Sequence, residues 1–166
     1  GRFKGQKIRT IAKASYRPTT SRVRKSIFDM LGGLDGCSVL DLFAGSGILG
    51  FEAASRGAVA VTFVDNDRRN VQLIHVNSQI FQDQVDLKVV CKECFHYLRV
   101  RHEHDIIFAD PPYGKFDISK LVEKCLTTLL NNGRFVLETS FRESIPAGGR
   151  SKRHGDTMIT IWTKIV

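Results

Sequence analysis

The sequence predicts a single α/β domain with a mainly parallel sheet of seven strands, helices on both faces and an antiparallel hairpin at the C-terminal end. Strand-like runs alternate with helical patterns over most of the 166 residues, which is typical of parallel strands joined by covering helices. Residues 151–164 instead show period-two alternation around Gly155-Asp156, the pattern of two antiparallel strands and a tight turn. The length suffices for one domain with a sizeable core.

Each expected strand is a short run of apolar residues followed by a turn or a helix signal. The strands are expected at 38–43, 59–64, 86–90, 105–109, 134–138, 151–154 and 157–164. The helices are expected at 21–31, 48–56, 67–81, 95–100 and 118–130. The first helix carries an apolar stripe that includes Ile27, Met30 and Leu31, and Asn131-Asn132-Gly133 ends the last one.

Positive charge is concentrated at the N-terminal end of the chain. Residues 1–28 contain nine Lys or Arg and no acid, whereas the whole chain has 25 basic and 17 acidic residues, so 16 basic residues face 17 acidic ones in the remainder. Such a patch is expected to bind a polyanion, because phosphate contacts supply much of the affinity of nucleic-acid binding. We therefore divide the chain into a basic arm, 1–20, and a domain, 21–166.

Other features of the composition point to a cytoplasmic protein with free thiols. No segment resembles a signal peptide, and no apolar run approaches the roughly 18 residues of a membrane span. Cys91-x-x-Cys94 lies near three histidines, but no second pair of ligands follows, so no metal site is expected. The other two cysteines, Cys37 and Cys125, also favour buried thiols over a disulfide framework.

A glycine-rich turn follows the first strand. It reads Asp41-Leu42-Phe43-Ala44-Gly45-Ser46-Gly47-Ile48-Leu49-Gly50, and Asp65 lies at the tip of the next strand. The glycines permit close approach of a ligand, the following helix presents free amides, and Asp65 suits a ribose diol. A dinucleotide site would share these features, but the carboxylate of Asp41 suits a cationic amino-acid moiety better than a pyrophosphate.

The tetrapeptide Asp110-Pro111-Pro112-Tyr113 directly follows the apolar run at 105–109. The prolines end the strand and leave carbonyl groups without ladder partners, while the acid accepts N–H bonds and the ring stacks on a flat heterocycle. This chemistry suits a nucleobase with an exocyclic amine. The tetrapeptide resembles the [Asp/Asn/Ser]-Pro-Pro-[Tyr/Phe] motif of amino-methyltransferases, which use S-adenosylmethionine.

Three segments together resemble the RsmD family, bacterial methyltransferases that act on guanine N2 of small-subunit (16S) ribosomal RNA. The segments are 17–25, beginning Arg17-Pro18-Thr19-Thr20, then 39–47 around the glycine turn, and then 108–113, which contains the Pro-Pro motif. The first segment discriminates best, because it separates this family from other proteins with that motif. The resemblance implies a Rossmann-like class I methyltransferase fold over nearly the whole chain.

The resemblance also implies roles for individual residues. Asp110, Pro111, Pro112 and Tyr113 would form the catalytic centre, with Asp110 also near the cofactor. The remaining cofactor contacts would come from Asp41, Phe43, Ala44, Gly45, Gly47, Asp65, Asn66, Glu93 and Cys94. Substrate RNA would meet Arg17, Thr19, Arg22 and Tyr113. Glu93-Cys94 replaces the Asp-Ala that the family often has, and keeps a carboxylate for the adenine amine.

Three alternatives stay open at this point. An adenine-N6 methyltransferase of DNA or RNA would share the fold and the Pro-Pro motif, although Asp110 matches the adjacent N1–H and N2–H donors of guanine. A nicotinamide-dependent dehydrogenase would explain the glycines alone. A non-catalytic RNA-binding scaffold would keep the fold. We expect a monomeric cytoplasmic enzyme that acts on ribosomal RNA, free or in an assembly intermediate.

Overall fold

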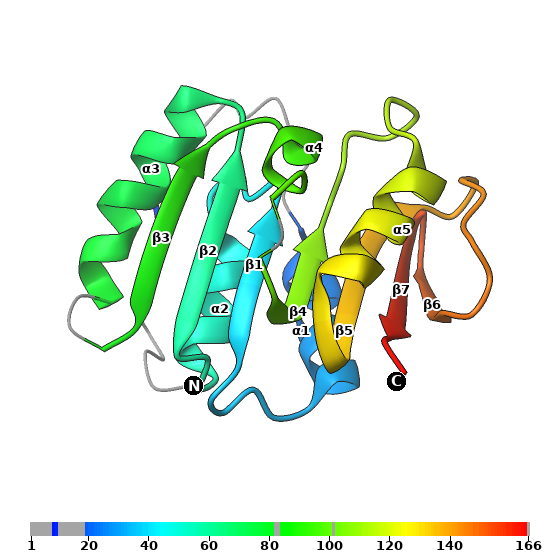
Figure 1. Cartoon of the computed structure of the whole chain (residues 1–166), viewed down its shortest axis with the longest axis horizontal. Helices are drawn as coiled ribbons and strands as arrows, with labels where there is room; N and C mark the ends of the chain where they lie inside the picture. Colours follow the sequence, from blue (N-terminus) through cyan, green and yellow to red (C-terminus); the bar gives the residue numbers. More distant parts are fainter. Residues whose placement is uncertain (1–7, 10–18, 82–83, 101, 166) are drawn as a thin grey trace.

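A seven-stranded sheet runs through the centre of the computed structural model, which describes residues 8–9, 19–81, 84–100 and 102–165 (Figure 1). Its strands are β1 (Ser38–Leu42), β2 (Ala60–Asp65), β3 (Asp86–Cys91), β4 (His104–Ala109), β5 (Leu129–Ser140), β6 (Arg150–His154) and β7 (Thr157–Thr163). Their order across the sheet is β3-β2-β1-β4-β5-β7-β6. Strands β1 to β5 are parallel, and β7 pairs antiparallel with both β5 and β6. The predicted fold class is confirmed.

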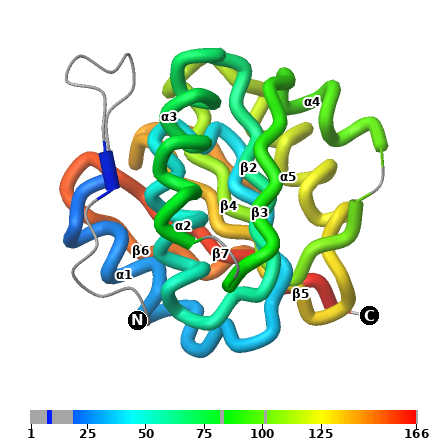
Figure 2. Tube along the Cα trace, turned by 90° about the vertical axis from the view of Figure 1, so that its left-hand side faces the viewer, coloured from blue at the N-terminus to red at the C-terminus, as the bar shows by residue number. Residues whose placement is uncertain are grey.

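Helices cover both faces of this sheet (Figure 2). Helices α1 (Ser21–Leu31), α2 (Ile48–Ser55) and α3 (Arg68–Ser78) lie on one face, and α4 (Cys94–Tyr97) and α5 (Ile118–Thr128) lie on the other. A short 3-10 turn, Gln79–Phe81, continues α3. In the part of the chain that the structure describes, no helix combines the length and the apolar character needed to cross a membrane.

Alternation along the strands divides the apolar residues between two cores. In β4, Ile106 and Phe108 pack against α1 to α3, whereas Ile107 and Ala109 pack with residues of α4 and α5. All four side chains are buried, because successive residues of a strand face opposite sides of the sheet. The central strands are therefore largely apolar, and their acids, Asp41 and Asp65, lie at or near the carboxyl ends.

Side-chain caps fix where several helices begin. Thr20, Asp67, Glu93 and Asp117 each accept a hydrogen bond from a backbone N–H in the first turn of the helix that follows. Helix α2 has no such cap and begins at Gly47 in a left-handed conformation. Gly47 thus provides no side-chain cap, and the Gly50 amide in the first turn of α2 is bound instead by the carboxylate of Asp41 in β1.

Strand β5 is longer than predicted, because it begins inside the segment expected to end α5. Its pairing with β4 shifts between His104, opposite Leu129, and Ile106, opposite Arg134. Asn132, within this bulge, has a φ of 62°. The Asn-Asn-Gly sequence thus makes a bulge within a strand rather than a turn before one, since both need the same unusual backbone conformations.

Residues 8–9 lie against α3 and are held there by one side chain. Asn77, which is 1% exposed, accepts a hydrogen bond from the backbone N of Arg9 at 2.9 Å and donates one to its carbonyl at 3.0 Å. The same amide approaches the carbonyl of Ser46 in the glycine turn at 3.4 Å. Asn77 therefore connects the start of the chain to the turn between β1 and α2.

Candidate active site

A cleft of about 430 Å³ opens at the carboxyl ends of β1, β2 and β4, where the strands deliver their polar residues. A ligand site at this edge is usual for parallel α/β sheets. The lining residues are Phe43, Gly45, Val64, Asp65, Asn66, Asp67, Asn70, Lys92, Glu93, Cys94, Asp110, Pro111, Pro112, Tyr113, Lys115 and Phe116. The cleft therefore joins the glycine turn to the Pro-Pro motif, as the sequence predicted.

The glycine turn has an unusual backbone at three positions. Gly45 and Gly47 have φ values of 57° and 79°, and Phe43, which is not a glycine, has a φ of 59°. A Cβ on Gly47 would lie 2.7 Å from the ring of Phe51, so the residue needs both the conformation and the space of glycine. Phe43 in this region is energetically unfavourable, which is a common property of ligand-binding turns. Its ring lines the cleft.

Gly50, the last glycine of the pattern, serves packing rather than ligand approach. A Cβ there would lie 2.9 Å from Phe63 Cζ and 2.9 Å from Val61 Cγ1, both in β2. The third glycine thus lets α2 approach the sheet closely, and it does not line the cleft.

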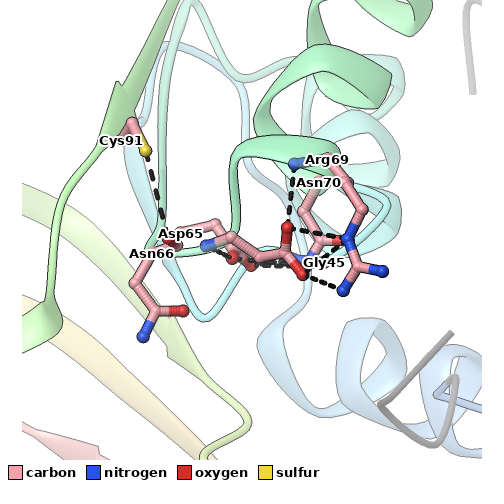
Figure 3. Close-up of polar contacts among 7 residues, drawn as sticks. Gly45, Asp65, Asn66, Arg69, Asn70 and Cys91 are labelled. Atoms are coloured by element: carbon pink, nitrogen blue, oxygen red, sulfur yellow. Dashed lines mark hydrogen bonds and ion pairs between the residues drawn. The ribbon is translucent and has the colours of Figure 1, made fainter.

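Asp65 is 8% exposed and is surrounded by donors from the protein itself (Figure 3). Its Oδ2 accepts from the backbone N of Gly45 at 2.8 Å, and its Oδ1 accepts from the backbone N of Asp67 at 2.8 Å. The side-chain amide of Asn70 contacts both oxygens at 3.2 Å. Asp65 therefore fastens the glycine turn to the end of β2, in addition to lining the cleft.

Asp41 lies beneath the turn rather than on the wall of the cleft. It is 3% exposed, and its Oδ2 accepts a hydrogen bond from the backbone N of Gly50 at 2.9 Å. Burial raises the pKa of Asp41 to about 8; the Gly50 amide opposes this shift, and the nearby charge of Asp65 adds to it. Without a cationic ligand, Asp41 is thus largely protonated at neutral pH. Ala44 and Gly47 adjoin the cleft but, like Asp41, do not line it.

On the opposite wall, Glu93 and Cys94 follow β3. An oxygen of Glu93 accepts from the backbone N of His96 at 2.9 Å and so caps α4. The thiol of Cys94 is buried, and burial raises its pKa to about 12, which keeps it protonated and unreactive. In the described part of the chain, no cluster of three His, Cys, Asp or Glu side chains is arranged to hold a metal ion.

The Asp110-Pro111-Pro112-Tyr113 segment forms the next part of the wall, immediately after β4. Asp110 is partly buried, Pro111 is buried, and Tyr113 is 38% exposed at the mouth. The backbone N of Gly114 donates to Glu143 Oε1 at 3.1 Å, which ties this segment to the chain after β5. The acid is thus inside the cleft and the ring is at its entrance.

Phe116, which was not among the predicted site residues, also lies in the wall of the cleft. Its ring meets Phe43 edge to face at 4.8 Å and stacks on Phe95 at 5.7 Å. Lys92, Lys115, Asp67 and Asn70 also line the cleft and were not predicted. The spacing of Phe116 from Tyr113 was a usable signal, but the lysines are exposed side chains in turns and carry no pattern.

The predicted RNA-binding residues begin beside the cleft. Thr19 is 8% exposed and its hydroxyl donates to Glu138 Oε2 at 3.2 Å, across from the end of β5. Arg22 is exposed in the first turn of α1. Neither lines the cleft. Arg17 lies outside the described residues, as does most of the basic arm.

The shape and chemistry of the cleft fit S-adenosylmethionine. Its volume lies in the range of small-molecule sites, and its aromatic rings offer flat apolar surfaces for a heterocycle. The carboxylates of Asp110 and Glu93 complement the positive sulfonium and the exocyclic amine. The fold and this cleft define a class I methyltransferase, and S-adenosylmethionine is the cofactor of that class.

Comparison with known proteins gives the family. Residues 1–163 match the family described as "Conserved hypothetical protein 95", which is the RsmD family, and the chain belongs to it. The chain is 37% identical to "Putative rRNA methyltransferase YlbH" of Bacillus subtilis over 146 residues, 85% of this chain and 77% of that one. It is 34% identical to "Ribosomal RNA small subunit methyltransferase D" of Escherichia coli K12 over 140 residues, 80% of this chain and 66% of that one.

A solved structure agrees with this assignment. "Putative methyltransferase yhhF from Escherichia coli" superposes with a TM-score of 0.82 at 28% identity, and the match covers 100% of this chain and 96% of that chain. The predicted family and cofactor are confirmed. The assignment leaves no support for the nicotinamide-dependent dehydrogenase.

Proposed function

We propose that this protein methylates the exocyclic N2 of a guanine in small-subunit (16S) ribosomal RNA. The observation that carries the proposal is the Asp110-Pro111-Pro112-Tyr113 segment, which closes the cofactor cleft with a carboxylate inside and an aromatic ring at the mouth. Relatives named as ribosomal RNA methyltransferases support RNA as the substrate. The proposal includes a monomeric enzyme that acts in the cytoplasm.

In this mechanism, the protein positions the base and accepts its protons. S-adenosylmethionine, when bound, supplies an already activated methyl group, so neither a metal nor a covalent intermediate with the protein is needed. Asp110 and the carbonyl of Pro111 accept hydrogen bonds from the two N2–H groups and direct the nitrogen lone pair into the cleft, and the proton that N2 loses on methylation passes to Asp110 and then to solvent. Tyr113 stacks on the base, which has left its own stack to enter the site. Positioning of this kind lowers a barrier by several kcal/mol.

The choice of guanine depends on the carboxylate at position 110. Guanine presents N1–H and N2–H side by side, and one carboxylate accepts both, whereas adenine presents a donor beside an acceptor. An Asp110→Asn variant replaces one acceptor oxygen with an NH₂ donor, which opposes the N1–H of guanine. We therefore expect a larger loss of activity from Asp110→Asn than from a change that keeps both acceptors, such as Asp110→Glu.

Two measurements test this function. Nucleoside mass spectrometry of ribosomal RNA from a strain that lacks the protein should show loss of N2-methylguanine, and restoration by the wild-type gene. With purified protein, Asp110→Ala should abolish methyl transfer and leave the Kd for S-adenosylmethionine within a few-fold. Asp86→Ala, an exposed acid at the start of β3, is the matched control and should change neither. Loss of N6-methyladenine instead would assign the enzyme to adenine.

A further inference from the structure

A concentration of positive charge lies at the C-terminal edge of the sheet, where β6 meets α1. It consists of Arg22 in α1, Arg142 after β5, and Lys152, Arg153 and His154 in β6, and we call it the basic ridge. The lysine and the three arginines are exposed, and the histidine is partly buried. Charge counted along the chain does not reveal this ridge, because the residues outside 1–28 are close to neutral overall.

The ridge forms because edge strand β6 lies alongside α1, about 120 residues away in sequence (Figure 2). His154 Nε2 lies 2.9 Å from the hydroxyl of Ser26, and Arg150 Nη2 donates to the carbonyl of Met30 at 3.2 Å. These contacts lie along the length of the helix. Side chains of β6 and the start of α1 therefore share one surface.

This surface adjoins the mouth of the cleft. His154 pairs with Thr157 of β7, which pairs in turn with Ser140 at the carboxyl end of β5. The backbone N of Phe141 then donates to the carbonyl of Asp156, in the β6–β7 turn, at 3.0 Å. Glu143 accepts a hydrogen bond from the backbone N of Gly114. Arg142 precedes Glu143 and Tyr113 precedes Gly114 in the chain, so this hydrogen bond brings Arg142 and Tyr113 to the same part of the surface. The basic ridge and the ring of Tyr113 therefore lie along the same rim of the cleft mouth.

Two guanidinium groups of the ridge are held against an aromatic ring. The Cζ atom of Arg153 lies 3.7 Å from the centre of the Phe141 ring, and that of Arg142 lies 5.2 Å from it. Arg153 Nε also donates to the carbonyl of Gly155 at 2.7 Å. Such contacts reduce the freedom that an arginine side chain loses on binding, and a planar guanidinium matches the oxygens of a phosphate.

The ridge keeps a net positive charge within the described structure, although Asp29 of α1 is close enough to Lys152 to interact with it electrostatically. None of its five side chains forms an ion pair with a carboxylate of residues 19–81, 84–100 or 102–165. Burial, together with the positive charges of Lys152 and Arg22, lowers the pKa of His154. The four cationic side chains of the ridge lie close together and outnumber the nearby acid of α1, Asp29, so they favour a polyanionic partner.

We propose that the basic ridge binds the RNA phosphate backbone that flanks the target base. This inference rests on the proposed function, because a base that enters the cleft past Tyr113 draws its own backbone across the same rim. The ridge then supplies phosphate contacts on the α1 and β6 side of the cleft. The same lysine and arginines also discourage pairing of β6 with another sheet edge, a common use of charge on edge strands. The experiment separates these two roles.

The test variant is Lys152→Gln/Arg153→Gln, and its control is Lys88→Gln/Lys124→Gln. Both remove two positive charges, but Lys88 lies on the opposite edge strand, β3, and Lys124 lies on α5. Binding of a short hairpin RNA with a guanine in its loop is measured over a range of salt concentrations. The slope of log K against log salt should fall by about 1.5 in the test variant, since each lost phosphate contact contributes roughly 0.7 to 0.9. The control should keep the wild-type slope.

Kinetics provide a second readout on the same proteins. The test variant should raise KM for RNA about tenfold, with kcat at saturating RNA and the Kd for S-adenosylmethionine unchanged. Lys152→Gln alone, at an exposed position, should reduce the slope by about half as much and serves if the double variant folds poorly. Light scattering reports self-association of each variant.

Three outcomes would contradict the proposal that the basic ridge binds RNA. They are an unchanged salt slope, an equal change in the control, or self-association of the test variant with normal RNA binding, which would leave only protection of the edge strand. Weaker binding to a ribosomal protein with unchanged RNA binding would also count against it. Failure of the proposed function is distinct: wild-type protein would then transfer no methyl group to RNA, while the difference in salt slope between test and control would persist.

Discussion

Replacement of Asp65 by alanine separates two roles that the cleft assigns to one carboxylate. The side chain accepts from the backbone amides of Gly45 and Asp67, each at 2.8 Å, and contacts the amide of Asn70. It is 8% exposed, so little water replaces it in the variant. A buried donor left without an acceptor costs about 1 to 3 kcal/mol, and two such amides give an expected loss of roughly 2 to 6 kcal/mol in the free energy of unfolding.

Urea denaturation, followed by circular dichroism, measures this loss, and titration calorimetry measures the Kd for S-adenosylmethionine. Asp65→Asn keeps one acceptor oxygen and should lose less stability than Asp65→Ala. Asn70→Ala, which removes only the longer contacts at 3.2 Å, should lose least. If Asp65→Ala unfolded at the wild-type urea concentration and yet no longer bound the cofactor, its role in fastening the glycine turn would be refuted. The carboxylate would then act as a ligand alone.

Three further predictions concern buried groups. The fold should lose stability as the pH rises from about 4 toward 8, because burial raises the pKa of Asp41 to about 8 and disfavours its ionised form; Asp41→Asn should remove this dependence in urea titrations. His104 has a pKa lowered by burial to about 4 from 6.5, so the fold loses stability as the pH falls through that interval. The contribution of His104 to this loss is about 3 kcal/mol in the free energy of unfolding. Urea titrations at pH 7.5 and 4.5 measure the loss, and His104→Leu should abolish this contribution. Gly50→Ala should lower stability by about 1 to 3 kcal/mol, because its Cβ would crowd Phe63 and Val61; an unchanged urea midpoint would show that α2 can shift.

The sequence predicted the sheet well, because most residues of the central parallel strands β1, β2 and β4 are buried and apolar. The run at 105–109, for example, identifies β4 except for His104, whose buried ring nitrogens have no hydrogen-bond partner among the described residues. Period-two alternation likewise located β6 and β7. The start of β5 was missed, since Asn131-Asn132-Gly133 permits the same backbone conformations in a bulge as in a helix stop.

The composition of the cleft was predictable where a motif constrains the backbone, as at Gly45 and Asp110. The sequence could not show that Asp65 is already surrounded by amides, because those donors come from a turn 20 residues earlier and from the next helix. The basic ridge was hidden for a similar reason: α1 and β6 meet only after the sheet is complete. Neither the hydrogen bonds of Asp65 nor the grouping of the basic ridge could therefore be predicted, because both depend on residues that become neighbours only in the folded structure.

The contact between Asn77 and Arg9 recognises a peptide group and not a side chain. Both hydrogen bonds go to the backbone of residue 9, so selection can vary the amino acid at this position without loosening the attachment. Proline is the exception, because it has no N–H to donate. Substitution by glutamine should therefore leave residues 8–9 attached, whereas Arg9→Pro should break the hydrogen bond to Asn77 Oδ1.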